Sequence, residues 1–204
     1  MLSIRENVSL KEYSSFKIGG PSKYFCEPRS TSEVREAALW AKEKQLPIFI
    51  FGGGTNLLID DNGFHGLIIK PYLNVLGKKG IEVTVGAGVL VKDFLAFCIA
   101  HALQGFEWAG GLPGTMGGAI RGNAGAFGGE TKDSVISVKS FYLAALEEKM
   151  RTNEECVFGY RTSVFKEKRG EEMVLEAIFR FREGERERIR EAVEAKINYR
   201  KEKH

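Results

Sequence analysis

Long hydrophobic runs, a strong net charge and paired cysteines are all missing from this sequence, and each absence removes a class of function. No run of about 18 apolar residues occurs, so we expect no membrane-spanning helix, and the N-terminus lacks the apolar core of a secretory signal. The 30 basic and 27 acidic residues are too evenly balanced to indicate a nucleic acid or an acidic membrane as the partner. We therefore expect a cytoplasmic protein.

Cysteine and histidine are equally scarce. The three cysteines, Cys26, Cys98 and Cys156, are odd in number and far apart, and none forms a CxxC pair. Such pairs are typical of cysteine-rich zinc sites and of dithiol redox sites. The sequence therefore predicts reduced thiols and no metal site.

The first quarter of the chain predicts strand, helix, strand and loop. Residues 22–28 are typical of a strand, and Ser30 followed by Glu33 is a capping-box pattern that opens a helix over 31–45. The apolar run 47–51 predicts a second strand, which ends at three glycines. We expect a small parallel βαβ unit here.

The rest of the chain predicts further strands and helices, with a mixed or antiparallel sheet over 135–181. Strands are expected at 66–70, 81–85, 135–143 and 173–181, and a helix over about 89–103. Residues 105–129 are expected to be irregular, because neither a regular helix nor a central strand tolerates so much glycine.

A last helix is expected near the C-terminus. Ile189, Val193 and Ile197 recur at helical spacing and form a narrow apolar stripe among charged residues. We expect this stripe to be a contact surface without a partner in the chain.

The segment FGGGTNLLI at 51–59 is the first candidate binding site. Its three glycines let backbone N–H groups approach a phosphate that any Cβ would hold off. A tight turn that merely ends a strand explains the glycines equally well. The segment is no Walker loop, because no lysine follows the glycines at the required place.

A second candidate is GGLPGTMGGAIRGNAGAFG at 110–128. Pro113 fixes one turn, while Gly114, Gly117 and Gly118 leave successive amides bare, as in an anion nest. A flexible linker would instead be rich in serine and charge, whereas this segment interleaves apolar side chains. The partial GxGxxG match at 85–91 indicates only a strand-to-helix turn.

A third candidate is FGYRTSVFK at 158–166, which places Tyr160, Arg161, Ser163 and Lys166 in one short segment. An arginine offers a permanent fork of donors for a carboxylate or a developing enolate. The alternative is an exposed arginine at the edge of a strand.

These segments, in this order, together with YSSFKIGGPSKYF at 13–25, resemble the UDP-N-acetylenolpyruvoylglucosamine reductase family of bacterial cell-wall synthesis, also called UDP-N-acetylmuramate dehydrogenase. The resemblance extends to about residue 181. It implies an α+β fold of the vanillyl-alcohol-oxidase (PCMH) type, with FAD-binding subdomains at 1–71 and 72–182. Residues 183–204 would lead towards a third, substrate-binding domain that this sequence does not contain.

The resemblance also implies noncovalently bound FAD. The residues that it assigns to the FAD diphosphate are Gly52, Gly53, Gly54, Thr55, Asn56, Leu57 and Leu58. Those that it assigns to the rest of the flavin are Leu112, Pro113, Gly114, Thr115, Gly117, Gly118, Ala119, Asn123, Gly125 and Gly128. His65 and His101 lie outside both glycine-rich loops, so neither is expected to attach the flavin covalently.

The implied reaction reduces UDP-N-acetylglucosamine enolpyruvate to UDP-N-acetylmuramate, with NADPH as reductant. Arg161 matches the family's catalytic arginine, with Tyr160 beside it in the substrate site. The family's proton-donating serine and assisting glutamate belong to segments absent from this sequence, so we expect a partner or a missing domain to contact the 186–200 helix. The alternative function is a noncatalytic or electron-transfer FAD-binding module of the same fold.

Overall fold

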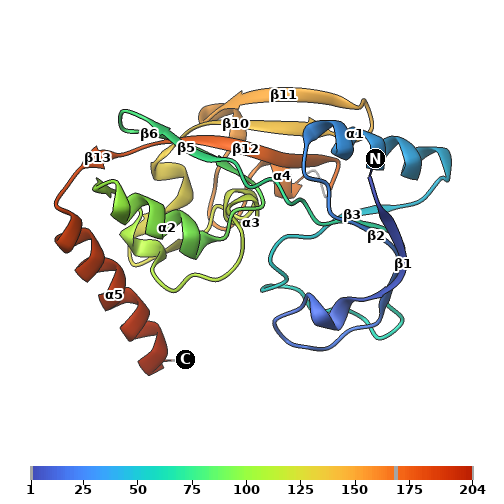
Figure 1. The fold of residues 1–204 in the computed structure, drawn as a ribbon, viewed down its shortest axis with the longest axis horizontal. Coiled ribbons are helices and arrows are strands. Elements are labelled where there is room, and N and C mark those ends of the chain that lie inside the picture. Colours follow the sequence, from blue (N-terminus) through green and yellow to red (C-terminus); the bar gives the residue numbers. More distant parts are fainter. Residues whose placement is uncertain (1, 168–169, 204) are drawn as a thin grey trace.

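The computed structural model describes residues 2–167 and 170–203 and is built on two main sheets (Figure 1). The four-stranded sheet has the order β1-β2-β4-β3, and the five-stranded sheet has the order β11-β10-β12-β6-β5. Each sheet uses a separate part of the chain, so the two halves follow one another in sequence.

The four-stranded sheet holds the predicted βαβ unit. Its strands are β1 (Ile4–Ser9), β2 (Pro21–Cys26), β3 (Ile48–Ile50) and β4 (Phe64–Ile69). β2 and β3 are each parallel to β4, which lies between them, so the predicted parallel arrangement is confirmed. The unpredicted β1 is a largely exposed edge strand whose polar sequence carries little strand signal.

The helix α1 (Thr31–Glu43) begins where the capping pattern predicted. The Ser30 hydroxyl accepts a hydrogen bond from the Glu33 amide at 3.2 Å. The Glu33 carboxylate accepts from the Arg29 amide instead of from Ser30, so only one half of the capping box forms.

The five-stranded sheet is antiparallel throughout, as its strand pairs show. Its strands are β5 (Leu76–Lys79), β6 (Glu82–Gly86), β10 (Val135–Tyr142), β11 (Glu147–Thr152) and β12 (Glu172–Arg180). The three predicted strands, β6, β10 and β12, are the central ones. The two unpredicted strands, β5 and β11, lie at the edges and are rich in lysine and glutamate.

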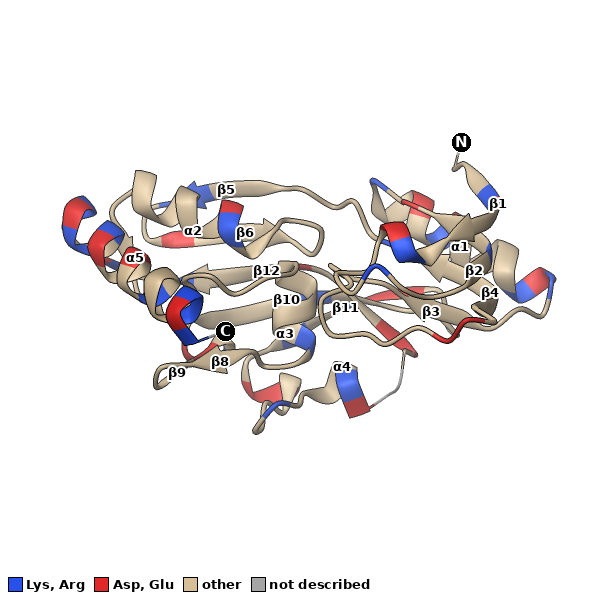
Figure 2. Cartoon of the chain, turned by 90° about the horizontal axis from the view of Figure 1, so that it is seen from below, with Lys and Arg blue, Asp and Glu red and all other residues tan. Residues whose placement is uncertain are grey.

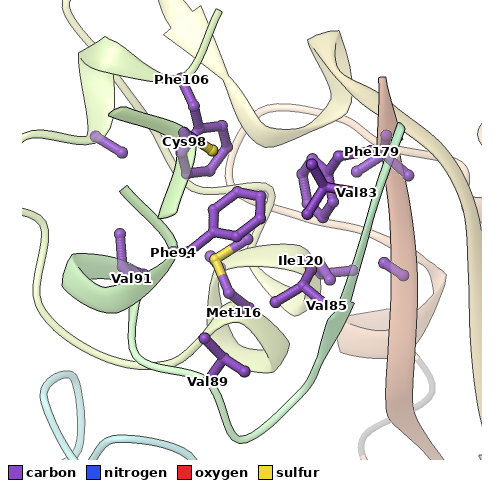
Figure 3. Close-up of a cluster of buried hydrophobic side chains, with 14 of the residues drawn as sticks. Val83, Val85, Val89, Val91, Phe94, Cys98, Phe106, Met116, Ile120 and Phe179 are labelled. Atoms are coloured by element: carbon purple, nitrogen blue, oxygen red, sulfur yellow. The ribbon is translucent and has the colours of Figure 1, made fainter. Parts of the chain in front are cut away.

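The helices α2 (Val91–Ala100) and α3 (Met116–Arg121) cover one face of this sheet (Figure 1). The fully buried ring of Phe94 on α2 lies at the centre of the core (Figure 3). Its centroid is 5.2 Å from those of Phe106 and Phe179, so α2, the glycine-rich segment and β12 share one aromatic cluster.

The helix α3 corrects the expectation that residues 105–129 are irregular throughout. Met116 and Ile120 are fully buried and hold the helix against the core, while the Thr115 hydroxyl caps it by accepting from the Gly118 amide at 3.3 Å. Gly117 is required for packing, since a Cβ there would lie 2.8 Å from the Ala87 Cβ. Burial and capping therefore outweigh the low helix propensity of glycine.

Short elements complete the chain. They are η1 (Leu10–Glu12), β7 (Leu103–Gln104), η2 (Glu107–Ala109), β8 (Gly125–Ala126), β9 (Gly129–Glu130), η3 (Thr131–Asp133), η4 (Glu154–Cys156), α4 (Val164–Glu167) and β13 (Arg182–Glu183). β8 and β9 form a small hairpin, and β13 pairs with β7.

The two sheets share a core through α1. Val34 and Ala38 on α1 belong to the same buried cluster as Leu67 of the first sheet and Phe141 and Met173 of the second. The two halves of the chain are therefore joined by apolar packing as well as by the backbone.

The last helix, α5 (Arg186–Lys203), packs against the rest of the chain, so the expectation of an unpartnered stripe is wrong. Ile189 and Val193 are each 4% exposed, and Ile197 packs on the main core. The Arg200 Nε donates to the Gly110 carbonyl at 2.8 Å. Basic and acidic residues mix along the outer face of the helix (Figure 2).

Neither a membrane span nor a metal cluster is found in residues 2–167 and 170–203. No helix in this part of the chain has the length and apolar character needed to cross a bilayer. Nor does it bring together three or more histidine, cysteine or acidic side chains in a group that could hold a metal ion.

Candidate functional site

The two glycine-rich loops, which are about 60 residues apart in sequence, meet face to face. A Cβ on Gly53 would lie 2.6 Å from the Gly114 Cα, and a Cβ on Gly114 would lie 3.1 Å from the Thr55 Oγ1. A Cβ on Gly52 would likewise lie 3.3 Å from the Thr115 Oγ1. Backbones approach this closely only where side chains are absent, which explains the glycines on both sides.

Free amides distinguish the first loop from an ordinary turn. None of the backbone amides of 52–56 donates a hydrogen bond to another described residue. Gly52, Gly53 and Thr55 are only half-buried, so a ligand can reach them. Successive unpaired N–H groups in a glycine-rich bend form a concave anion-binding surface.

The second loop is fixed by the turn that connects β6 to α2. Val91 N donates to the Gly114 carbonyl at 3.0 Å, Met116 N donates to the Val89 carbonyl at 2.8 Å, and Gly117 N donates to Ala87 O at 3.0 Å. Residues 87–90 thus form the predicted strand-to-helix turn and also hold the second loop in place.

A segment for which no role was predicted supports the first loop. The amide and hydroxyl of Ser15 both donate to the Gly54 carbonyl, at 3.1 and 3.2 Å. Gly54 has a φ of +66°, and a Cβ there would lie 2.1 Å from the Tyr13 carbonyl oxygen. The matching run YSSF at 13–16 was a signal for this contact, although no residue role was assigned to it.

The helix α3 leads from the loops to a second group of predicted residues. Its six residues, Met116–Arg121, span about 9 Å, with Thr115 just before the helix at the loops and Asn123 just beyond its other end. Asn123 is 1% exposed and its side-chain amide donates to the Gly159 carbonyl at 2.9 Å. The chain therefore brings the tight turn 159–162 beside the glycine-rich segment.

The tight turn presents Tyr160 and Arg161 to solvent. Gly159 and Thr162 exchange backbone hydrogen bonds of 3.1 and 3.3 Å, which closes the turn. Arg161 has a φ of +56°, a left-handed conformation that costs about 1–3 kcal/mol for a residue other than glycine. Strain of this kind is concentrated at functional sites.

A groove of about 440 Å³ lies between this turn and the β8–β9 hairpin. Its lining comprises Gly125, Ala126, Gly128, Gly129, Glu130, Lys132, Asp133, Tyr160 and Arg161. Four of these residues, Gly125, Gly128, Tyr160 and Arg161, are among the predicted site residues, whereas the charged ones from η3 and its flank are not.

Charge in the groove is partly neutralised. The Lys132 Nζ lies 2.7 Å from the Glu130 Oε2, and this hydrogen bond, with one from Asn123, lowers the pKa of Glu130 below its usual value. Arg161 has no ion pair with any described carboxylate. The guanidinium of Arg161 is thus the cation available to an anionic ligand.

The predicted apolar residues of the two loops differ in burial, and two of them pack inside the protein instead of lining a binding surface. Ala119 is 6% exposed and packs into the core, and Leu57 packs on the small cluster around Phe51. Leu58 is 80% exposed beside the first loop. Leu112 is half-buried and Pro113 is exposed where the second loop begins.

The three cysteines, His65 and His101 lie outside the site. Burial raises the pKa of each thiol, Cys26, Cys98 and Cys156, to about 12. These thiols are inert hydrophobic contacts in the folded chain. His65 and His101 are both exposed, and the latter packs on Phe97.

Comparison with known proteins identifies relatives over the whole site. The family described as "FAD binding domain" matches residues 22–144. A UDP-N-acetylenolpyruvoylglucosamine reductase of Caldanaerobacter subterraneus is 37% identical over 203 residues, which is 97% of this chain and 65% of that protein. The reductase of Lactobacillus acidophilus is 36% identical, over 92% of this chain and 62% of that protein. The chain therefore spans less than two thirds of the length of these relatives.

Solved structures agree on the fold. The crystal structure of UDP-N-acetylenolpyruvylglucosamine reductase from Thermus caldophilus matches with a TM-score of 0.85 at 27% identity, over 98% of this chain and 70% of that one. A 6-hydroxy-D-nicotine oxidase from Arthrobacter nicotinovorans matches with a TM-score of 0.65 at 18% identity, over 90% of this chain and 42% of that one. The predicted α+β fold of the vanillyl-alcohol-oxidase type is confirmed.

Proposed function

The chain belongs to the FAD-binding domain family, and on that premise we propose that it is the flavin-binding part of an NADPH-dependent UDP-N-acetylenolpyruvoylglucosamine reductase of peptidoglycan synthesis. The reductase names of relatives 36–37% identical over nearly the whole chain support this activity.

The direct approach of Gly53 to Gly114 carries the proposal. FAD contains a diphosphate, and the free amides of 52–56 with the Thr55 hydroxyl supply donors on the side of the first loop. Thr115 and Gly114 close the site from the other side. A side chain at Gly53 would collide with the Gly114 backbone and push the two loops apart, which would displace the donors from the diphosphate.

Bound FAD would supply the hydride-transfer chemistry, which protein side chains cannot supply. The groove beside α3 would then receive the enolpyruvyl substrate. Arg161, exposed and unpaired among the described residues, would bind the substrate carboxylate and stabilise enolate-like charge as it develops. Tyr160 would lie against the nucleotide sugar.

Three further points belong to the same proposal. The residues 1–71 and 72–182 would act as the two subdomains that clasp the flavin, since one main sheet falls in each range. Free buried thiols favour a cytoplasmic location. Tyr199, which is 49% exposed on α5, offers a contact for a further domain or partner.

The test separates the two halves of the reaction under anaerobic conditions. The chain is loaded with FAD, NADPH is added, and flavin absorbance is followed before and after UDP-N-acetylglucosamine enolpyruvate is supplied. Bleaching by NADPH and recovery with the substrate would support the reductase. An Arg161→Lys variant should bleach normally and recover more slowly, because a lysine cannot reproduce the planar fork of donors.

Other outcomes discriminate clearly. Bleaching without recovery would identify an FAD-binding or electron-transfer module that lacks the substrate step. A chain that takes up no FAD would contradict the proposal altogether.

A further inference from the structure

The side chain of Asn123 connects the end of α3 to two other segments, residues 130–132 and the turn that begins at Gly159. Its Nδ2 donates to the Glu130 Oε2 at 3.0 Å and to the Gly159 carbonyl at 2.9 Å. Its Oδ1 accepts from the Lys132 amide at 3.1 Å. Both of its N–H donors and its carbonyl oxygen are therefore bonded within the protein.

Burial reinforces this assignment. Asn123 is 1% exposed and has a φ of +40°, so its backbone also takes the left-handed conformation that asparagine tolerates better than most residues. A side chain this enclosed has no polar group to offer a cofactor. The resemblance alone had placed Asn123 among the flavin ligands.

The turn that carries Arg161 needs such a support. Arg161 occupies the third position of the turn, where a positive φ favours glycine or asparagine, so the turn has no intrinsic preference for holding an arginine there. Ser163 directly follows the turn, and its hydroxyl anchors that side by donating to the Arg121 carbonyl at 2.7 Å. Asn123 anchors the preceding side through Gly159.

We propose that Asn123 is a positioning residue, which fixes the Gly159–Thr162 turn against the end of α3 and so sets where the Arg161 guanidinium lies in the groove, and that it is not a ligand of the flavin. The inference rests on the proposed substrate role of Arg161. Its geometric part depends only on the hydrogen bonds of this chain.

The test replaces Asn123→Asp, which keeps an acceptor for the Lys132 amide and removes both donors. Asn123→Asp/Glu130→Gln relieves the repulsion between the two carboxylates and still leaves the Gly159 carbonyl without its donor. The matched control is Asn153→Asp. Asn153 also donates twice, to the Lys132 and Val135 carbonyls at 2.8 Å each, and makes no contact with the tight turn.

Each variant is examined in three ways. Backbone ¹⁵N relaxation reports the order parameters of residues 160–162. Fluorescence titration gives FAD affinity, and the flavin difference spectrum gives the affinity for UDP-N-acetylglucosamine enolpyruvate. Thermal unfolding shows how much stability each substitution removes.

We expect both Asn123 variants to lower the order parameters of 160–162 from about 0.85 to below about 0.6, and to weaken substrate binding at least as much as Arg161→Lys does. FAD affinity should stay within two- to three-fold of the unsubstituted chain. Asn153→Asp should lower the melting temperature to a similar degree and leave the turn as rigid as before. If Asn123 only stabilised the fold, its variants and Asn153→Asp would affect the order of the turn and substrate binding alike.

Two results would overturn the proposal. One is a turn that stays rigid in both Asn123 variants, or that is already mobile in the unsubstituted chain. The other is a large loss of FAD affinity with an unchanged turn. If the unsubstituted chain binds FAD and gives no response to the substrate, the proposed reductase function fails, and the order parameters still decide the positioning role.

Discussion

At the scale of single residues, the glycines of the two loops have different physical roles. Gly53 is needed because another backbone lies 2.6 Å from its Cβ position, whereas Gly77 in β5 has nothing within 4 Å. Residue type alone does not separate these cases. The distinction depends on which loop lies opposite, and this is fixed by tertiary contacts.

A Gly53→Ala substitution should therefore weaken FAD binding and the fold together. Forcing a methyl group against Gly114 should cost about 1–3 kcal/mol of unfolding free energy, and the displaced loop should bind FAD at least ten-fold more weakly. Urea unfolding and FAD fluorescence titration measure the two effects. Gly77→Ala is the control and should change neither; equal losses in both variants would contradict the account.

Arg161 illustrates a conflict between stability and function at one residue. Asparagine adopts positive φ more readily than arginine, so Arg161→Asn should raise the unfolding free energy by roughly 0.5–1 kcal/mol. The same change should reduce binding of the enolpyruvyl substrate, since the guanidinium is gone. Urea unfolding of the two chains decides this, and a loss of more than about 1 kcal/mol would show that the turn is unstrained.

Residue types with a fixed chemistry could be predicted from the sequence. The glycines and Arg161 were chosen because only those residues leave amides bare or carry a permanent fork of donors. The role of Asn123 could not be predicted, because its partners at 130 and 159 become neighbours only in the fold. Ser15 was missed for the same reason.

At the scale of elements, the missed strands were those whose sequences carry no burial signal. The edge strands β5 and β11 read as polar, and β1 is mostly exposed, so hydrophobic periodicity does not detect them. α3 was missed for the opposite reason, because its glycines hide a short helix that is held by two buried side chains.

The position of α5 depends on the hairpin at its side. The ring centroid of Phe127 lies 5.3 Å from that of Tyr199, 4.7 Å from the Lys196 Nζ and 5.1 Å from the Arg200 Cζ. Phe127→Ala should therefore increase hydrogen exchange at the amides of 196–203 about ten-fold. Phe49→Ala, at a similarly exposed site on β3, is the control and should leave α5 unchanged. Unaltered exchange in both chains would mean that Ile189 and Val193 hold the helix without Phe127.

At the scale of the whole molecule, the shared cluster around α1 predicts that both sheets unfold together. Cys26 lies in that cluster, and Cys98 lies in the core of the second sheet. Burial raises the pKa of both thiols to about 12, so neither should react with a thiol reagent until the chain opens.

Ellman's reagent in increasing urea tests this prediction. Variants that retain only one of the two cysteines should be labelled at the same rate at each urea concentration, and no faster than global unfolding measured by circular dichroism. Early labelling of Cys26 alone would show that the first sheet opens independently, which contradicts a shared core.

The overall architecture was more predictable than its details. The βαβ unit and the central strands of the second sheet follow from apolar runs in the sequence, and the α+β class follows from the family resemblance. The burial of the α5 stripe was not predictable, because the surface that covers it comes from η2 and α2. Local patterns show that a face is apolar and do not show what covers it.

The central claim is that the two facing glycine-rich loops hold FAD without a covalent bond. The most direct measurement is the visible absorption spectrum of the purified chain after addition of FAD and removal of the excess. The account predicts a yellow protein with one FAD per chain, all of it released into the filtrate after denaturation. A chain that remains colourless, or flavin that stays with the denatured polypeptide, would contradict it.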